Sequence, residues 1–148
     1  MRALVQRVTR AHVDIDGETV SSIGKGFVIL LGVGHDDGEE QADKLWAKIS
    51  KMRIFEDENG KMNRSIKDIG GEILSISQFT LFADVRKGNR PSFVKAGKPE
   101  HANITWIKFN EALRSGGVPV REGRFGTHMR VGLINDGPVT ITIDTDNL

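Results

Sequence analysis

The segment Phe27-Val28-Ile29-Leu30-Leu31 constrains the fold of this chain more than any other feature of its sequence. All five side chains are apolar, so a strand formed here would be hydrophobic on both faces. Strands of this kind occur where a sheet is covered on both sides. Lys25-Gly26 introduces the segment. The sequence therefore predicts a buried strand with other structure packed above and below it.

Further strands are predicted on either side of this segment. Val13 and Ile15 alternate with polar residues and precede Asp16-Gly17, a turn signal that predicts a β-hairpin. Residues 72–82 predict another strand, and Val118-Pro119-Val120 predicts a short extended segment.

Two helices are also predicted. Asp37 with Glu40 three residues later has the spacing of a capping box, so the first helix is expected to begin there. A second helix is expected near Pro99, which suits a first helical turn, and to end at Gly116-Gly117. Apolar residues recur at helical intervals in both: Ala42, Leu45, Trp46 and Ile49 in the first, and Ala102, Trp106, Phe109 and Leu113 in the second.

These elements predict a mixed α/β fold in one domain spanning residues 1–148. The expected architecture is a curved or barrel-like, mostly antiparallel β-sheet backed by two helices, in β/β/α layers. A chain of 148 residues is long enough to bury a core in one domain. Its 38% hydrophobic and 28% charged residues are typical of a globular protein.

The composition also excludes several classes of site. The chain has no cysteine, which rules out disulfides, thiolate metal sites and cysteine nucleophiles. It has no His-x-x-x-His pair for a metal, and its glycines lack the GxGxxG and GKS/T spacings of nucleotide-binding loops. No apolar run approaches the roughly 18 residues of a membrane span, and the N-terminus lacks a signal-peptide core. We therefore expect a cytoplasmic location with no membrane partner.

Positive charge is concentrated in one segment, although the net charge is only +1. Residues 86–98, the basic loop, contain no acid and include Phe93. Such a loop either contacts a phosphate backbone or is simply solvated, and charge alone leaves both interpretations open. Its five cations are Arg86, Lys87, Arg90, Lys95 and Lys98.

A first candidate for chemistry lies where the strand predicted from Glu72 becomes polar. After Ile76, the alternation of a strand puts Ser77 and Phe79 on one side and Gln78 and Thr80 on the other. Polar side chains at the end of a buried strand are well placed for a site on a rigid scaffold. Serine and threonine are also common in strands that have only a structural role, so this segment alone decides nothing.

A second candidate is Gly137-Pro138, near the C-terminus. Residues 131–134 and 139–143 predict a hairpin-like pair of strands, joined by a turn at Asn135-Asp136-Gly137-Pro138. Glycine tolerates unusual dihedrals, and proline makes a cis peptide bond accessible. The turn is therefore either a rigid loop that exposes backbone carbonyls or an ordinary turn with a trans proline.

Together the two segments resemble the signature of the D-aminoacyl-tRNA deacylases. That family has a Ser-Gln-x-x-hydrophobic segment and an Asn-x-Gly-Pro-x-Thr segment, and both patterns are complete here, in Ser77–Leu81 and Asn135–Thr140. The resemblance extends over essentially the whole chain. It implies a homodimer with its active site at the subunit interface, a substrate of aminoacyl-tRNA bound by its 3′-terminal adenosine, and neither cofactor nor metal.

The resemblance also implies roles for individual residues. Gly137-Pro138 would be a cis motif that enters the partner subunit's pocket, where its carbonyls reject an L-side chain but accept a D-side chain or a hydrogen. Arg7 would hold that motif in place. Catalytic positions around the scissile ester would be Ser77, Gln78, Phe79 and Thr80, and Ala102 and Phe125 would line the pocket or the adenosine site.

Two mechanisms are open at this stage. Thr80 could be a nucleophile, but an activated hydroxyl needs a neighbouring base. The spacing of His12, His35, His101 and His128 suggests none. Alternatively, the ribose 2′-hydroxyl next to the ester activates or positions water, while backbone N–H groups of Phe79 and Thr80 stabilise the oxyanion.

Three other functions compete with this one. The chain could be an RNA-binding module without activity, in which the basic loop and Phe93 hold tRNA. It could be a deacylase of the same fold for a mischarged L-amino acid, but that sister group carries proline where this chain has Ser77. A structural β-rich dimerisation domain would leave the pairing of the two motifs unexplained.

Overall fold

Strand β3 (Gly26–Gly32) lies in the middle of a six-stranded mixed sheet. The computed structural model describes residues 1–148 and orders this sheet β2-β1-β3-β6-β7, with β8 paired to β1. β3 runs antiparallel to β1 (Arg2–Ile15) and parallel to β6 (Glu72–Ser77). The sheet is mostly antiparallel, as predicted, with parallel pairing only where β6 joins β3 and β7 (Val120–Glu122).

The side chains of β3 enter two separate hydrophobic cores. Phe27, Ile29 and Leu31 belong to the larger core, which the helices share, whereas Val28 belongs to a smaller core within the curved part of the sheet. Successive side chains of a strand point to opposite faces, so one strand can supply both cores. The prediction that this strand is covered on both sides is confirmed.

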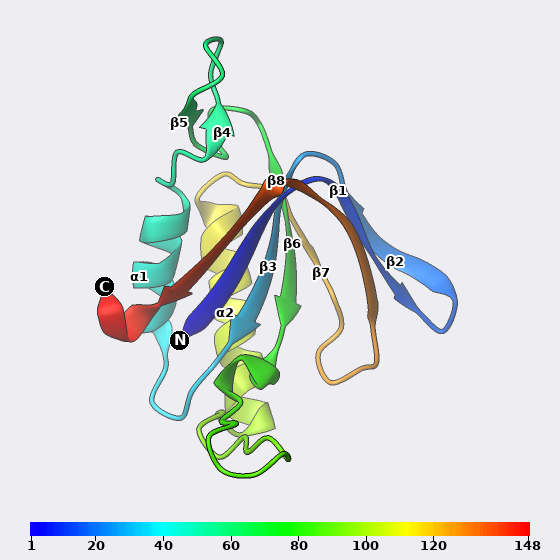
Figure 1. The fold of residues 1–148 in the computed structure, drawn as a ribbon, viewed down its shortest axis with the longest axis vertical. Coiled ribbons are helices and arrows are strands. Elements are labelled where there is room, and N and C mark those ends of the chain that lie inside the picture. Colours follow the sequence, from blue (N-terminus) through cyan, green and yellow to red (C-terminus); the bar gives the residue numbers. More distant parts are fainter.

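The curvature of the sheet comes from β1. Residues 2–8 of β1 pair with β3, and residues 11–15 pair with β2 (Glu18–Ile23), while β8 runs along the other edge. The two halves of β1 therefore belong to different parts of the sheet, and Figure 1 shows the strand bending between them. β2 then reaches β7, where Ser21 Oγ donates to the carbonyl of Glu122 at 2.5 Å. This contact nearly closes the sheet, which confirms the barrel-like prediction.

Helices α1 (Glu39–Ile49) and α2 (Pro99–Ser115) cover one face of the sheet (Figure 1). The second helix begins at Pro99 and ends before Gly116, as predicted. Neither helix is long and apolar enough to cross a membrane. The core side chains of the two helices are those expected from the spacing, except that Trp46 is only half-buried: Ala42, Leu45, Ile49, Ala102, Trp106, Phe109 and Leu113.

The predicted start of the first helix was wrong. The N-cap is Gly38, whose N–H donates to the side chain of Gln41 at 2.9 Å. Asp37 is not available as a cap because its carboxylate is buried and accepts hydrogen bonds from elsewhere. The N-terminal ammonium of Met1 donates to it at 2.7 Å, and Gly34 N–H donates at 2.6 Å.

The C-terminal hairpin was also predicted wrongly. β8 (Arg130–Asp144) is a single strand, and both of its halves pair antiparallel with β1. The predicted turn is instead a bulge, since Asn135 pairs with Val8 and Thr140 pairs with Gln6. We call residues 136–139 the Gly-Pro loop.

Three smaller features complete the chain. The strand predicted at 72–82 ends at Ser77 and is followed by the 3-10 helix η1 (Phe79–Phe82). A short hairpin of β4 (Phe55–Glu56) and β5 (Met62–Arg64) projects from the domain, and η2 (Thr145–Asn147) ends it.

Candidate active site

A half-open pocket lies at the end of β6, where the first motif was predicted. Its volume is about 850 Å³. The walls come from the end of β6, the basic loop, the first turn of α2 and the loop between β7 and β8. Five of the predicted site residues line it: Ser77, Gln78, Phe79, Ala102 and Phe125.

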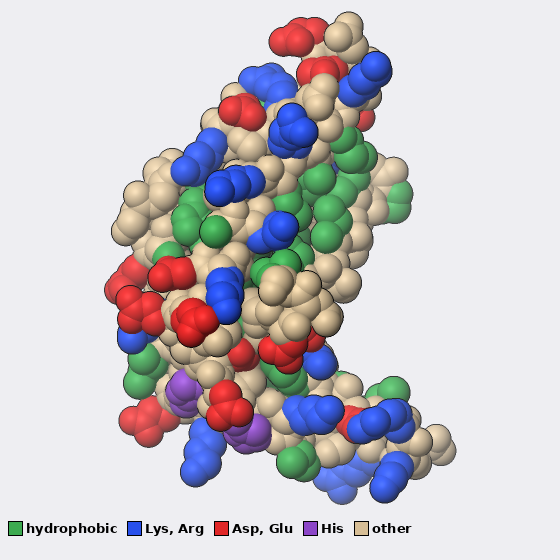
Figure 2. Space-filling model, turned by 90° about the vertical axis from the view of Figure 1, so that its left-hand side faces the viewer, with side chains coloured by type: hydrophobic (Ala, Val, Ile, Leu, Met, Phe, Trp, Pro, Cys, Tyr) green, Lys and Arg blue, Asp and Glu red, His purple; other side chains and the backbone are tan.

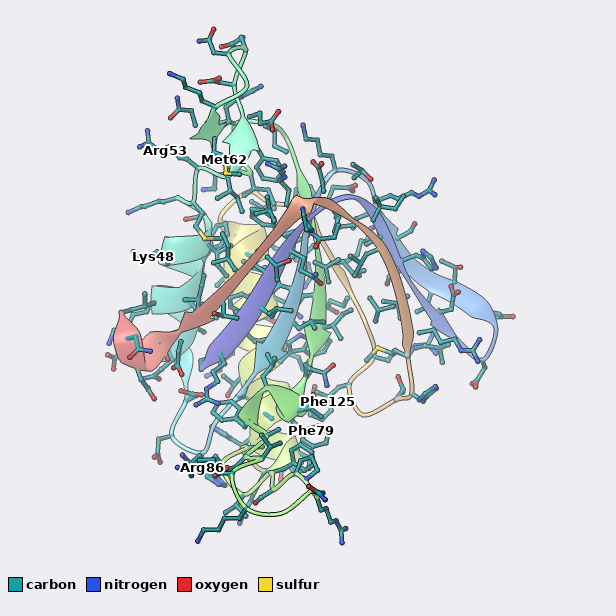
Figure 3. All side chains as sticks on the ribbon, viewed as in Figure 1. Lys48, Arg53, Met62, Phe79, Arg86 and Phe125 are labelled. Carbon is teal, nitrogen blue, oxygen red and sulfur yellow. The ribbon has the colours of Figure 1, made fainter.

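Aromatic rings form two walls of this pocket. Phe79 is 53% exposed and meets Phe93 of the basic loop edge to face, with ring centroids 5.0 Å apart. Phe125 packs against Trp106 of α2, with centroids 6.2 Å apart. Figure 3 shows Phe79 and Phe125 at the same end of the molecule. These rings offer flat apolar surfaces of the kind on which a nucleobase stacks.

Phe125 is supported from behind by a buried hydrogen bond. Trp106 Nε1 donates to the hydroxyl of Ser75 at 3.0 Å, and Ser75 is fully buried in β6. The carbonyl of Ser75 accepts from Gly123 N–H at 3.0 Å, at the start of the loop that carries Phe125. One residue of β6 therefore fixes both the helix and the loop behind this wall.

Thr80 is exposed and does not line the pocket. Its hydroxyl accepts a hydrogen bond from the side-chain amide of Gln78 at 2.5 Å, and no imidazole or carboxylate is bonded to it. An amide cannot act as a general base, so this geometry does not activate the hydroxyl as a nucleophile.

The basic loop lies at the mouth of the pocket and is held in place at both ends. At one end, Arg86 forms an ion pair with Asp84, and this side-chain hydrogen bond keeps the pKa of the Asp84 carboxyl well below its usual value. At the other end, Gly97 N–H donates to the carbonyl of Val33 at 2.8 Å. Phe93, Val94 and Lys98 of this loop line the pocket.

The Gly-Pro loop is held by Arg7 and Asn135. Arg7 is 4% exposed, and its Nε donates to the carbonyl of Asp136 at 3.1 Å while Nη1 donates to the carbonyl of Ile54 at 2.7 Å. The side-chain amide of Asn135 donates to the carbonyls of Arg7 and Val139, at 3.0 and 2.9 Å. The Gly137-Pro138 peptide bond is cis, and both residues are exposed. The guanidinium group of Arg7 thus ties the Gly-Pro loop to the segment before β4.

The structure does not bring the two motifs together within one chain. Arg7 pairs with Phe27, which pairs with Ile73, and Ser77 lies four residues further along β6. At about 3.3 Å per residue, that offset is roughly 13 Å along the sheet. The pocket therefore lacks Arg7, Gly137 and Pro138 as well as Thr80.

Several residues of the pocket wall were not predicted individually. They lie in loops, so no periodicity marks them. The nearest signal in the sequence is Phe125-Gly126-Thr127, of which only Phe125 was predicted as a site residue. No group of three or more His, Asp or Glu side chains is placed to hold a metal ion. The residues missed include Val33, Val94, Gly97, Thr127, His128 and Met129.

Comparison with known proteins assigns the chain to a family. A family model described as D-Tyr-tRNA(Tyr) deacylase matches residues 4–144. A D-aminoacyl-tRNA deacylase of Bifidobacterium longum subsp. infantis is 66% identical over 155 residues, covering 99% of this chain and 96% of the relative. The D-aminoacyl-tRNA deacylase of Deinococcus radiodurans is 56% identical over 144 residues, covering 97% and 99%. Among solved structures, a c-Myc DNA Unwinding Element Binding Protein is similar, with a TM-score of 0.92, 44% identity, and 97% and 98% of the two chains covered. The chain belongs to the D-Tyr-tRNA(Tyr) deacylase family.

Proposed function

We propose that the chain hydrolyses the ester bond between a D-amino acid and tRNA, releasing the free amino acid and tRNA. Relatives with 66% and 56% identity over nearly the full chain bear the name of this activity, and this observation carries the proposal. The pocket at the end of β6, with Phe79 and Phe125 in its walls, has room for a terminal nucleoside and its ester. The activity is assigned to the cytoplasm, where charged tRNA is used.

The active site is completed by a second copy of the chain. The Gly-Pro loop of one copy enters the pocket of the other, so that a homodimer has two composite sites. Two features support this arrangement: the exposed Gly137-Pro138 backbone is held rigidly by Arg7, and it lies at the far end of the sheet from its own pocket. A rigid exposed loop and a half-open pocket on one chain are complementary parts of a two-fold interface.

Selectivity follows from this backbone. The carbonyls of Gly137 and Pro138 face the chiral carbon of the substrate and exclude an L-side chain. A D-side chain points away from them, and glycine has no side chain to exclude, so glycyl-tRNA is cleaved as well. Rejection of this kind discriminates by a clash with the wrong substrate.

Catalysis is assigned to water, with the ribose 2′-hydroxyl beside the ester helping to activate or position it. Phe79 and Thr80 begin η1, and the first N–H groups of a helix have no acceptor within it. These two N–H groups are free to stabilise the developing oxyanion, and such donors are among the largest catalytic contributions. The hydrogen bond from Gln78 to the Thr80 hydroxyl, with no base nearby, favours this route over covalent catalysis.

The first experiment compares D-tyrosyl-tRNA with L-tyrosyl-tRNA, with and without EDTA, by following loss of the ester. Selective loss of the D-ester that the chelator does not change is the expected result. Binding of both tRNAs without cleavage of either would instead support a nucleic-acid-binding module.

A further inference from the structure

Four of the five cations in the basic loop form no ion pair. Arg86 is paired with Asp84, whereas the other four form no ion pair. The segment from Asp84 to Lys98 contains no acid except Asp84 itself. Figure 2 shows several Lys and Arg side chains gathered on this projecting part of the molecule. The four unpaired residues are Lys87, Arg90, Lys95 and Lys98.

The loop is built to hold these charges at a fixed position. Asp84 and Ser92 exchange two backbone hydrogen bonds, at 2.8 and 2.9 Å, which close the loop on itself. His35 Nε2 is hydrogen-bonded to the carbonyl of Val94 at 2.6 Å. These contacts fix the loop beside the pocket that its residues line.

The anchored charges surround the entrance to the pocket. Lys98 lines the pocket, and so does Phe93, which stacks edge to face on Phe79. Proteins bind single-stranded nucleic acid with cations placed along its phosphate backbone and with exposed aromatic rings on which its bases stack. A polymer whose last nucleoside enters the pocket would have to leave across this loop.

We propose that the basic loop is the RNA-backbone contact of this chain. Lys87, Arg90, Lys95 and Lys98 contact the phosphodiesters of the single-stranded 3′ end whose terminal nucleoside ester occupies the pocket. This inference rests on the proposed function for the identity of the ester. It adds that much of the affinity for the polymer comes from this one loop and depends on salt.

The test uses a Lys87→Gln/Arg90→Gln variant, because neither residue lines the pocket. The control is Lys48→Gln/Lys51→Gln, which removes two exposed cations without an ion pair at the end of α1, and Figure 3 shows Lys48 away from Phe79. Each protein is assayed on D-tyrosyl-tRNA over a range of salt concentrations, and on D-tyrosyl adenosine, which has no phosphate.

The loop variant is expected to lose about tenfold in kcat/KM on the tRNA at low salt. The slope of log kcat/KM against log salt concentration should become shallower by about 1.4. Each of the two lost phosphate contacts to single-stranded RNA contributes about 0.7 to that slope. Hydrolysis of D-tyrosyl adenosine should not change, and the control should match the wild type on both substrates. An unchanged salt slope, an equal loss in the control, or an equal loss on the adenosine ester would overturn the proposal.

Failure of the proposed function would look different. The wild type would then hydrolyse neither ester, and the salt dependence of binding to uncharged tRNA would still decide the role of the loop. A slope that the loop variant does not alter in that binding assay would overturn the inference by itself.

Discussion

At the scale of single residues, the Gly-Pro loop depends on two side chains that lie far apart in the sequence. Arg7 reaches across to the carbonyls of Asp136 and Ile54, and Asn135 closes the base of the loop. Together these two side chains donate four hydrogen bonds to backbone carbonyls. Such groups specify a single conformation, because any other arrangement would leave them unpaired.

Gly137→Ala is expected to abolish discrimination and most activity. Gly137 has φ +121°, and a Cβ there would lie 2.7 Å from Val139 Cγ2 and 3.2 Å from Arg7 Nη2. The loop must shift, and a displacement of about 1 Å at a reacting centre costs about a hundredfold in rate. The measurement is kcat/KM on D-tyrosyl-tRNA, with Thr142→Ala on the same strand as control. Wild-type kcat/KM in Gly137→Ala would contradict the role of this loop.

Thr80→Ala is expected to reduce kcat by less than about tenfold, whereas removal of a true nucleophile costs more than about a thousandfold. The hydroxyl only accepts a hydrogen bond from Gln78, so its loss should alter positioning and not the chemistry. Single-turnover deacylation gives the rate, and circular dichroism checks the fold. A loss as large as that of Gly137→Ala in a folded protein would restore the covalent mechanism.

At the scale of elements, α2 does more than cover the sheet. Its first turn supplies Ala102 to the pocket, and one turn later Trp106 supports Phe125 and bonds to Ser75. The helix therefore ties the pocket wall to β6, the strand that ends in Ser77. Packing and site geometry are coupled through this one indole ring.

Trp106→Phe should raise KM more than it lowers kcat, because it loosens the support of Phe125 without touching Ser77 or Gln78. Stability should fall by about 1–3 kcal/mol, since the Ser75 hydroxyl is left buried without its donor. Urea unfolding and steady-state kinetics measure the two effects. Trp46→Phe is the matched control, as its indole makes no hydrogen bond in this structure. An unchanged KM would refute the positioning role.

The elements also separate what sequence can predict from what it cannot. The apolar spacing from Ala102 to Leu113 is local, and the helix it predicts is confirmed. Asn135-Asp136-Gly137-Pro138 is an equally strong local turn signal, yet β8 is continuous because both of its halves pair with β1, more than a hundred residues away. Asp37 failed as a cap for the same reason, since Met1 takes its carboxylate. Of the candidate site, the residues at the end of β6 were predictable, whereas the loop backbone of the pocket carries no such signal.

At the scale of the whole molecule, the two motifs lie at opposite ends of one sheet. Figure 3 places Phe79 and Phe125 at one end and Met62, in the hairpin whose base Arg7 contacts through Ile54, at the other. A single chain therefore presents a pocket at one end and the exposed Gly-Pro loop at the other. Under the proposed function, activity is therefore a property of a dimer in which each pocket receives the loop of the other copy.

Mixing two inactive variants should therefore restore activity. One variant, Gly137→Ala, has a displaced Gly-Pro loop and an intact pocket. The other variant, Ala102→Phe, has an intact Gly-Pro loop and a filled pocket. After joint refolding, about a quarter of the sites should be intact, because half of the random dimers are mixed and each has one good site. Deacylation of D-tyrosyl-tRNA reports this, with native mass spectrometry to count mixed dimers. Mixed dimers without activity would rule out a shared site.

The pairing of β8 with β1 has a consequence for folding during synthesis on the ribosome. β1 is made first of all the strands and β8 last, yet the two run side by side over most of their length. Domains begin to form during synthesis, at about 5–20 residues per second. A nascent chain can therefore assemble β3 and β6 while Arg7 still has no Asp136 to hold. Under the proposed function, a pocket can tell the handedness of its ester only after the final strand of a second copy has docked, because each pocket receives the Gly-Pro loop of its partner.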